Sequence, residues 1–321
     1  MKNFIYKKVK SVKEASQALL ANRQALPYAG GTDLLDLIKD GIVQPAELVD
    51  LKGIPGLDRI VYKPGKGLSI GAAVPLVEVA EHPVVVKKYP VLAQAARAVA
   101  SPQLRNMGTI GGNICQRPRC WYFRGDFDCL RKGGDICYAV EGENKFHCVV
   151  GGGPCFIVHP SDTAVALSAL SASLVVFSGK KSKALSMDDF FVLPDKDVMR
   201  ENVLRPGEIL TEIRVPEAPA DMHGKFLKFT ERDVWDFATV SGAVVWFGDG
   251  KKVKRGRVVF GGVAPIPWFE KEVSAALTGL ALDTPSVEKL AAKALRQAEP
   301  MTQNEFKITM ARNLLKSLLL P

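Results

Sequence analysis

All six cysteines of this chain fall in one short stretch, and this clustering limits what the stretch can be. They are Cys115, Cys120, Cys129, Cys137, Cys148 and Cys155. Cysteines that serve only as small apolar side chains would be scattered among strands and helices. Disulfides, a zinc site or an iron–sulfur cluster could each explain the grouping. Disulfides are disfavoured, because the N-terminal sequence MKNFIYKKVKSVKEA lacks the apolar core of an export signal and the cytosol keeps thiols reduced.

The spacing of the cysteines predicts a metal or cluster site without choosing between zinc and iron. Zinc sites usually present paired C-x2–4-C hooks, and only Cys115 and Cys120 are that close in sequence. Iron–sulfur clusters accept longer and irregular loops. The stretch is also rich in glycine and has little periodicity, so it cannot form a core of its own. A bound group is therefore the plausible organiser of this stretch.

The composition excludes several classes of protein. Hydrophobic residues make up 47% and charged residues 24% of the 321 residues, which is ordinary for a globular chain of about two domains. The net charge of +9 is scattered, which indicates a solvated surface rather than a nucleic-acid site. The longest apolar runs, at 258–264 and 164–177, are too short or too interrupted to cross a bilayer. We therefore expect a soluble, cytoplasmic protein without a nucleic-acid or membrane partner.

Helix and strand patterns alternate along the chain and predict an α+β fold. The N-terminal part reads as a helix that opens with the capping box Ser11–Glu14, a strand at 25–29, a helix after Asp33 and a strand at 47–51. The middle part has two strands within 58–73, helices at 75–81, 89–100 and 162–170, and a strand at 172–177. The C-terminal part has strands at 225–230, 239–247 and 254–260, then helices at 270–277, 286–298 and 304–319.

Two glycine-rich turns favour a ligand that carries phosphate. Residues 29–33 (Ala-Gly-Gly-Thr-Asp) lie between a predicted strand and a helix start, and residues 108–113 (Gly-Thr-Ile-Gly-Gly-Asn) form the second turn. Glycines let backbone N–H groups approach phosphate oxygens. Neither turn is a P-loop or a GxGxxG fingerprint, and each one alone is usually only a turn. Two such turns in separate subdomains would suit the pyrophosphate of a dinucleotide.

Four motifs in order resemble the FAD-binding subunit of the molybdenum hydroxylases, the family of xanthine dehydrogenase, aldehyde oxidoreductase and carbon monoxide dehydrogenase. They lie at 28–33, 105–113, 159–162 and 205–210, and the likeness covers essentially the whole chain. The resemblance implies a two-subdomain FAD-binding domain of the vanillyl-alcohol-oxidase/MurB type, followed by a C-terminal α+β domain with an antiparallel sheet and helices. The implied boundaries are 1–55 for the first subdomain, 56–215 for the second with the Cys-rich loop 115–155, and 216–321 for the C-terminal domain.

The resemblance also implies which residues hold FAD. Residues 27–34 and 109–113 would hold the pyrophosphate, and Asp162 would contact the adenosine half. Leu210 and Lys228 would line the flavin, with the segment 232–238 near its ring. No catalytic acid or base is implied. The expected cofactor-binding residues are Pro27, Tyr28, Ala29, Gly30, Gly31, Thr32, Asp33, Leu34, Gln103, Thr109, Gly111, Gly112, Asn113, Asp162, Leu210 and Lys228.

The long Cys-rich loop is similar to an insertion in the β subunit of 4-hydroxybenzoyl-CoA reductase and in bacterial periplasmic-type aldehyde oxidoreductases, where it carries a [4Fe–4S] cluster. The residues that match the four ligands are Cys120, Cys129, Cys137 and Cys155. Cys115 and Cys148 are left over, and Cys148 is the more credible substitute because it lies between two proposed ligands. We interpret His147 and His159 as loop histidines.

The resemblance implies an oxidoreductase subunit that transfers electrons through FAD and a [4Fe–4S] cluster. Its partners would be a large molybdenum-cofactor subunit, a small [2Fe–2S] subunit and a ferredoxin-like or other redox partner. The direction of electron flow stays open between aldehyde- or xanthine-type oxidation and 4-hydroxybenzoyl-CoA-type reduction. Two other functions are possible: a stand-alone FAD oxidoreductase of the same fold, and a zinc-stapled scaffold protein in which the glycine turns bind nothing.

Overall fold

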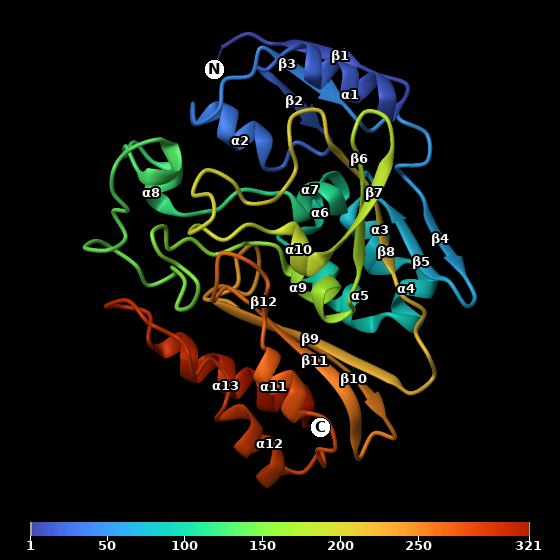
Figure 1. Cartoon of the computed structure of the whole chain (residues 1–321), viewed down its shortest axis with the longest axis vertical. Coiled ribbons are helices and arrows are strands. Elements are labelled where there is room, and N and C mark those ends of the chain that lie inside the picture. Colours follow the sequence, from blue (N-terminus) through green and yellow to red (C-terminus); the bar gives the residue numbers. More distant parts are fainter. Residues whose placement is uncertain (1, 321) are drawn as a thin grey trace.

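Three β-sheets follow one another along the chain in a computed structural model that describes residues 2–320. Each sheet has its own cluster of buried apolar side chains. The strands of the three sheets lie within 5–50, 60–215 and 222–269, and the domain boundaries expected from the sequence stay a prediction. Figure 1 shows the N-terminal sheet at the top of the view and the C-terminal sheet at the bottom.

The first sheet is parallel and has the order β1-β3-β2, with β1 at Ile5–Lys8, β2 at Ala25–Tyr28 and β3 at Glu47–Asp50. The helix α1 (Val12–Ala21) is capped by Ser11, whose hydroxyl accepts a hydrogen bond from the Glu14 N–H at 3.1 Å. The helix α2 (Leu34–Lys39) starts directly after the first glycine turn. The capping box and the strand–turn–helix order are thus confirmed, whereas β1 lacks a period-2 pattern that would predict it.

The second sheet is antiparallel and has the order β4-β5-β8-β6-β7. Its strands are β4 (Ile60–Lys63), β5 (Gly67–Gly71), β6 (Ser173–Phe177), β7 (Ser182–Ser186) and β8 (Ile209–Val215). The helices α3 (Leu76–Glu81), α4 (Pro83–Lys88), α5 (Pro90–Arg97), α6 (Pro102–Met107), α7 (Ile110–Ile114), α9 (Asp162–Ala169) and α10 (Met187–Phe190) belong to this part of the chain. The short helix α7 occupies the second glycine turn, which the sequence analysis left without an element.

The third sheet is antiparallel and has the order β12-β11-β10-β9. Its strands are β9 (Met222–Phe229), β10 (Val240–Gly248), β11 (Val253–Gly261) and β12 (Trp268–Phe269). The helices α11 (Lys271–Ala276), α12 (Thr284–Ala291) and α13 (Phe306–Leu319) cover one face of this sheet, while α5 and α9 contact its other face (Figure 1). The helix α12 ends earlier than the expected 286–298, because the chain leaves the helix at Ala292 and Leu295 has a positive φ of 53°.

The Cys-rich loop has almost no regular structure. It contains only the helical turns α8 (Trp121–Arg124) and η1 (Leu130–Lys132), and Figure 1 shows it at one side of the molecule between α2 and α13. Within 2–320, no helix is long and apolar enough to cross a membrane.

Candidate functional site

Two cavities meet at the two glycine turns. The smaller has a volume of about 340 Å³ and the larger about 620 Å³. Both are lined by residues 30–33 of the first turn and by Thr109 and Gly112 of the second. A two-part ligand could therefore occupy both cavities while its central part lies against the two turns.

The close approach of the two turns depends on glycine. A Cβ atom on Gly30 would overlap the carbonyl oxygen of Met107, and one on Gly111 would lie 2.7 Å from the carbonyl oxygen of Ala72. Gly31 has a φ of +74°, which disfavours any other residue. The backbones of the two turns thus pack directly on their neighbours, which leaves no side chain between a ligand and the peptide N–H groups.

The smaller cavity is mainly apolar. Its walls come from the first sheet, the first turn and the start of β8, and include Leu26, Leu34, Leu37, Val43, Leu51, Leu57, Ile209 and Leu210. Cys115 also lines it, and burial raises the pKa of this thiol to about 12, so it stays protonated. This lining suits a flat apolar group such as a purine ring.

The larger cavity contains a buried ion pair. Lys228 Nζ lies 2.7 Å from Asp162 Oδ2 and donates a second hydrogen bond to the Ala98 carbonyl at 3.0 Å. Burial raises the pKa of Asp162, and the neighbouring ammonium of Lys228 opposes that rise. Trp235 and Phe237, which are both exposed, line the same cavity from the loop after β9.

The structure brings most of the predicted cofactor residues together. All of them line one of the two cavities except Tyr28 and Gln103. Tyr28 packs edge-on against Tyr6, with 5.7 Å between the ring centroids. Gln103 is exposed on α6, whereas Leu104 and Met107 of that helix line the larger cavity.

Three of the predicted residues were expected at two different halves of FAD. Asp162 was expected at the adenosine half of FAD, and Leu210 and Lys228 at the flavin. The structure pairs Asp162 with Lys228 in the larger cavity and places Leu210 in the smaller one. Asp162 and Lys228 are thus in direct contact, whereas Leu210 lines the other cavity, and which half of FAD each one contacts stays a prediction.

Four of the six cysteines converge on a separate small cavity. Its walls include all four predicted cluster ligands, namely Cys120, Cys129, Cys137 and Cys155. The other two cysteines lie elsewhere: Cys115 lines the smaller apolar cavity, and Cys148 is buried with its pKa raised to about 12 by burial. The small cavity has a volume of about 10 Å³, which is room for about one water molecule.

The surroundings of the thiols in this cavity shift their pKa values in different directions. A hydrogen bond from the Cys137 thiol and the nearby Arg131 guanidinium lower the pKa of the Cys155 thiol. Burial raises the pKa of Cys120 to about 11. His147 Nε2 lies 3.3 Å from Cys120 Sγ, and burial lowers the pKa of His147 to about 4, so its ring is neutral. In residues 2–320, no three or more His, Cys, Asp or Glu side chains form a group that could hold a single metal ion.

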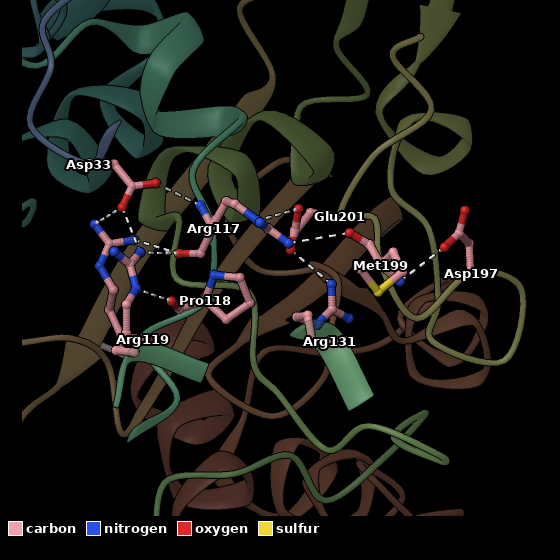
Figure 2. Close-up of polar contacts among 9 residues, drawn as sticks. Asp33, Arg117, Pro118, Arg119, Arg131, Asp197, Met199 and Glu201 are labelled. Atoms are coloured by element: carbon pink, nitrogen blue, oxygen red, sulfur yellow. Dashed lines mark hydrogen bonds and ion pairs between the residues drawn. The ribbon is translucent and has the colours of Figure 1, made fainter. Parts of the chain in front are cut away.

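A chain of ion pairs joins the Cys-lined cavity to the first glycine turn (Figure 2). Arg131 Nη1 donates to Glu201 at 2.8 Å, and Arg117 Nε donates to the same carboxylate at 3.1 Å. The backbone N–H of Arg117 donates to Asp33 at 2.8 Å, and Arg119 and Arg124 bind the other oxygen of that carboxylate at 3.0 and 2.6 Å. Asp33 thus lines both cavities at the glycine turns, but its carboxylate binds the Cys-rich loop.

Sequence reasoning missed Arg117, Arg131 and Glu201. The segments Gln-Arg-Pro-Arg-Cys and Cys-Leu-Arg-Lys place arginines beside two proposed ligands, which was the available signal for the arginines. Glu201 lies in an irregular segment far along the chain, and no local pattern marks it.

Comparisons with known proteins find similarity over nearly the whole chain. Residues 2–218 match the family described as FAD binding domain in molybdopterin dehydrogenase, and residues 225–321 match the CO dehydrogenase flavoprotein C-terminal domain. The chain is 36% identical to the aldehyde oxidoreductase FAD-binding subunit PaoB of Escherichia coli, over 99% of this chain and 98% of the relative. It is 29% identical to the carbon monoxide dehydrogenase medium chain of Hydrogenophaga pseudoflava, over 98% and 94%. A solved structure of carbon monoxide dehydrogenase from that organism superposes with a TM-score of 0.79 at 28% identity, covering 99% of this chain and 96% of the other.

Proposed function

The chain belongs to the FAD-binding subunits of the molybdenum hydroxylase family, and from that membership we propose that it passes electrons between FAD and a [4Fe–4S] cluster held in the same polypeptide. It is the flavoprotein subunit of an oxidoreductase complex, and its cofactor is FAD. The observation that carries the cluster is the convergence of four of the six cysteines on one cavity.

FAD fits the two cavities that meet at the glycine turns. The pyrophosphate would lie against Gly30, Gly31 and Gly112, which line both cavities. The adenosine half would occupy the smaller apolar cavity, and the flavin the larger one beside Asp162 and Lys228. FAD supplies a redox centre that can accept two electrons and release them one at a time. Asp162 and the Ala98 carbonyl hold the Lys228 ammonium in place, so its positive charge would lie beside the flavin.

A [4Fe–4S] cluster fits the donor set of the Cys-lined cavity. Four thiols are the usual ligands of such a cluster, and a cubane needs its ligands further apart than a single ion does. The cavity of about 10 Å³ is smaller than a cubane, so the thiols must move outward when the cluster binds. The surrounding loop can allow this, because it has only two short helical turns and is otherwise irregular. Zinc fits less well, because the described residues form no group for a single ion.

The partners follow from family membership. A large subunit with the molybdenum cofactor and a small [2Fe–2S] subunit would complete the complex. The 36% identity to an aldehyde oxidoreductase subunit favours aldehyde oxidation over 4-hydroxybenzoyl-CoA-type reduction. Electrons would then arrive from the small subunit and leave to an external acceptor. The molybdenum cofactor and the aldehyde would be held by the large partner subunit, so the purified chain alone should not oxidise an aldehyde.

The test compares two cysteine variants of anaerobically prepared protein. Cys129 lines the Cys-lined cavity, whereas Cys148 is equally buried but lies outside it. We expect Cys129→Ser to lose most of the iron while FAD stays bound, because Cys129 lines neither of the two cavities at the glycine turns. Cys148→Ser should keep both iron and FAD.

Three results would contradict the proposal. An unchanged iron content in Cys129→Ser would show that Cys129 is not a cluster ligand. A colourless preparation with zinc and no flavin would favour the scaffold protein. Full turnover by the isolated chain would favour the stand-alone oxidoreductase.

A further inference from the structure

Arg131 is a fully buried cation with unused hydrogen-bond donors. Its side chain is 1% exposed, and Nη1 donates to Glu201 at 2.8 Å. Its other two nitrogens, Nε and Nη2, are buried and have no hydrogen-bond partner. Unpaired donors in the interior are costly, so Nε and Nη2 call for an acceptor close to the guanidinium.

The unused donors belong to a side chain that lines the Cys-lined cavity. Arg131 is part of the wall of that cavity, together with the four cysteines. The acceptor that fits two spare N–H groups at this place is a sulfur atom, either a cysteine thiolate or an inorganic sulfide.

The charges around Arg131 do not cancel. Arg131 and Arg117 share the single carboxylate of Glu201, so these three side chains carry one excess positive charge. A cubane with four thiolate ligands is anionic, and reduction adds a further negative charge. An excess positive charge beside the cluster therefore stabilises the reduced state more than the oxidised state.

We propose that Arg131 donates hydrogen bonds to the sulfur atoms of the iron–sulfur site and raises its reduction potential. This inference rests on the proposed cluster. Glu201 holds the guanidinium in place, and Arg117 connects Glu201 to Asp33 at the first glycine turn (Figure 2). The contacts that hold the Cys-rich loop beside the flavin cavity therefore also hold the Arg131 guanidinium in place. The positive charge that favours reduction of the cluster thus belongs to a fixed, buried side chain.

The experiment measures the reduction potential of the cluster by EPR-monitored titration of the full chain with its cofactors. We expect Arg131→Met to lower the reduction potential of the cluster. At a given applied potential, the ratio of reduced to oxidised cluster should fall at least tenfold, which corresponds to a decrease of about 59 mV for a one-electron couple. Lys132→Met is the matched control. Lys132 lies on the same helical turn and donates to the Gly125 carbonyl, but it does not line the Cys-lined cavity, so its removal should change the ratio less than twofold.

The conservative variant separates this role from a structural one. Arg131→Lys keeps the charge and loses the planar donor set, so it should retain iron and show a smaller decrease in potential than Arg131→Met. A potential in Arg131→Met equal to that of the unmodified protein would overturn the proposal. So would loss of iron in both Arg131 variants, because that result would make the residue structural only. Absence of iron from the unmodified protein would instead show that the proposed cluster is wrong, and the inference with it.

Discussion

At the scale of single residues, burial decides which side chains carry charge. His159 is 4% exposed, its Nδ1 accepts a hydrogen bond from the Ser161 N–H, and its Nε2 is buried without a partner. Burial lowers the pKa of His159 to about 3. The ring is therefore neutral in the folded chain at any pH above that value.

This histidine should make the protein sensitive to acid. An unfolded chain protonates the ring near pH 6.5, whereas the folded chain does so only near pH 3. Between these values the unfolded state binds more protons, so the free energy of unfolding falls as the pH is lowered. The loss from this residue is about 3 kcal/mol by pH 4.

The prediction compares the pH dependence of urea unfolding between variants. Between pH 6.5 and pH 4, the free energy of unfolding should decrease by about 3 kcal/mol less in His159→Gln than in the unmodified protein. His223→Gln, at a half-buried position on β9, is the control and should keep the decrease of the unmodified protein. An identical pH dependence in all three proteins would show that His159 does not stay neutral on folding.

At the scale of elements, the two glycine turns must touch for the FAD site to form. Gly30 precedes α2, Met107 ends α6, and no space for a Cβ exists between them. Gly30→Ala should push the turns apart and weaken FAD binding roughly ten- to hundredfold, since overpacking typically costs about 1–3 kcal/mol.

The matched control is Gly53→Ala, because a Cβ there meets no atom closer than 4.0 Å and the backbone needs no positive φ. FAD affinity, measured by flavin fluorescence on the apoprotein, should be unchanged in Gly53→Ala. Equal affinity in both variants would show that the junction of the two cavities does not hold the pyrophosphate.

At the scale of the whole molecule, a buried lysine joins the C-terminal domain to the Cys-rich loop. Lys307 on α13 is 0% exposed, and its Nζ donates to the carbonyls of Phe146, His147 and Gly262 at 2.8 to 2.9 Å. The neighbouring Asn304 side chain donates to the carbonyls of His147 and Cys148 at 3.1 Å. Burial lowers the pKa of Lys307 to about 7, but three carbonyl acceptors need three N–H donors, which only the ammonium provides.

Removing this lysine should destabilise the folded protein. Lys307→Met removes one hydrogen-bond donor from each of three carbonyls, of which only that of His147 keeps a bond from Asn304, and should lower the free energy of unfolding in urea by about 3 kcal/mol. Lys316→Met on the same helix replaces a half-exposed lysine and should change it by less than about 0.5 kcal/mol. Similar stability of the two variants would mean that α13 does not need Lys307 to hold the loop.

Local patterns predicted the elements that their own residues specify. Ser11 and Glu14 set the start of α1, and the strands β10 and β11 follow from apolar runs of the right length. The strand β8 was missed, although the resemblance had marked its Leu210. It forms the centre of the second sheet between β5 and β6, and its residues lie more than 130 positions from their partners in β5. Such pairing cannot be read from a local period.

The sequence alone determined the family, the two glycine turns and the four cysteines that gather in one cavity, because short-range chemistry restricts which residues those positions accept. Only the tertiary structure decided that Asp162 pairs with Lys228, that Asp33 binds the Cys-rich loop, and that Arg131 shares Glu201 with Arg117. These ion pairs join residues 66 to 91 positions apart in the chain. A charge on its own does not specify its partner, and the packing of three separate cores is what brings these groups within hydrogen-bond distance.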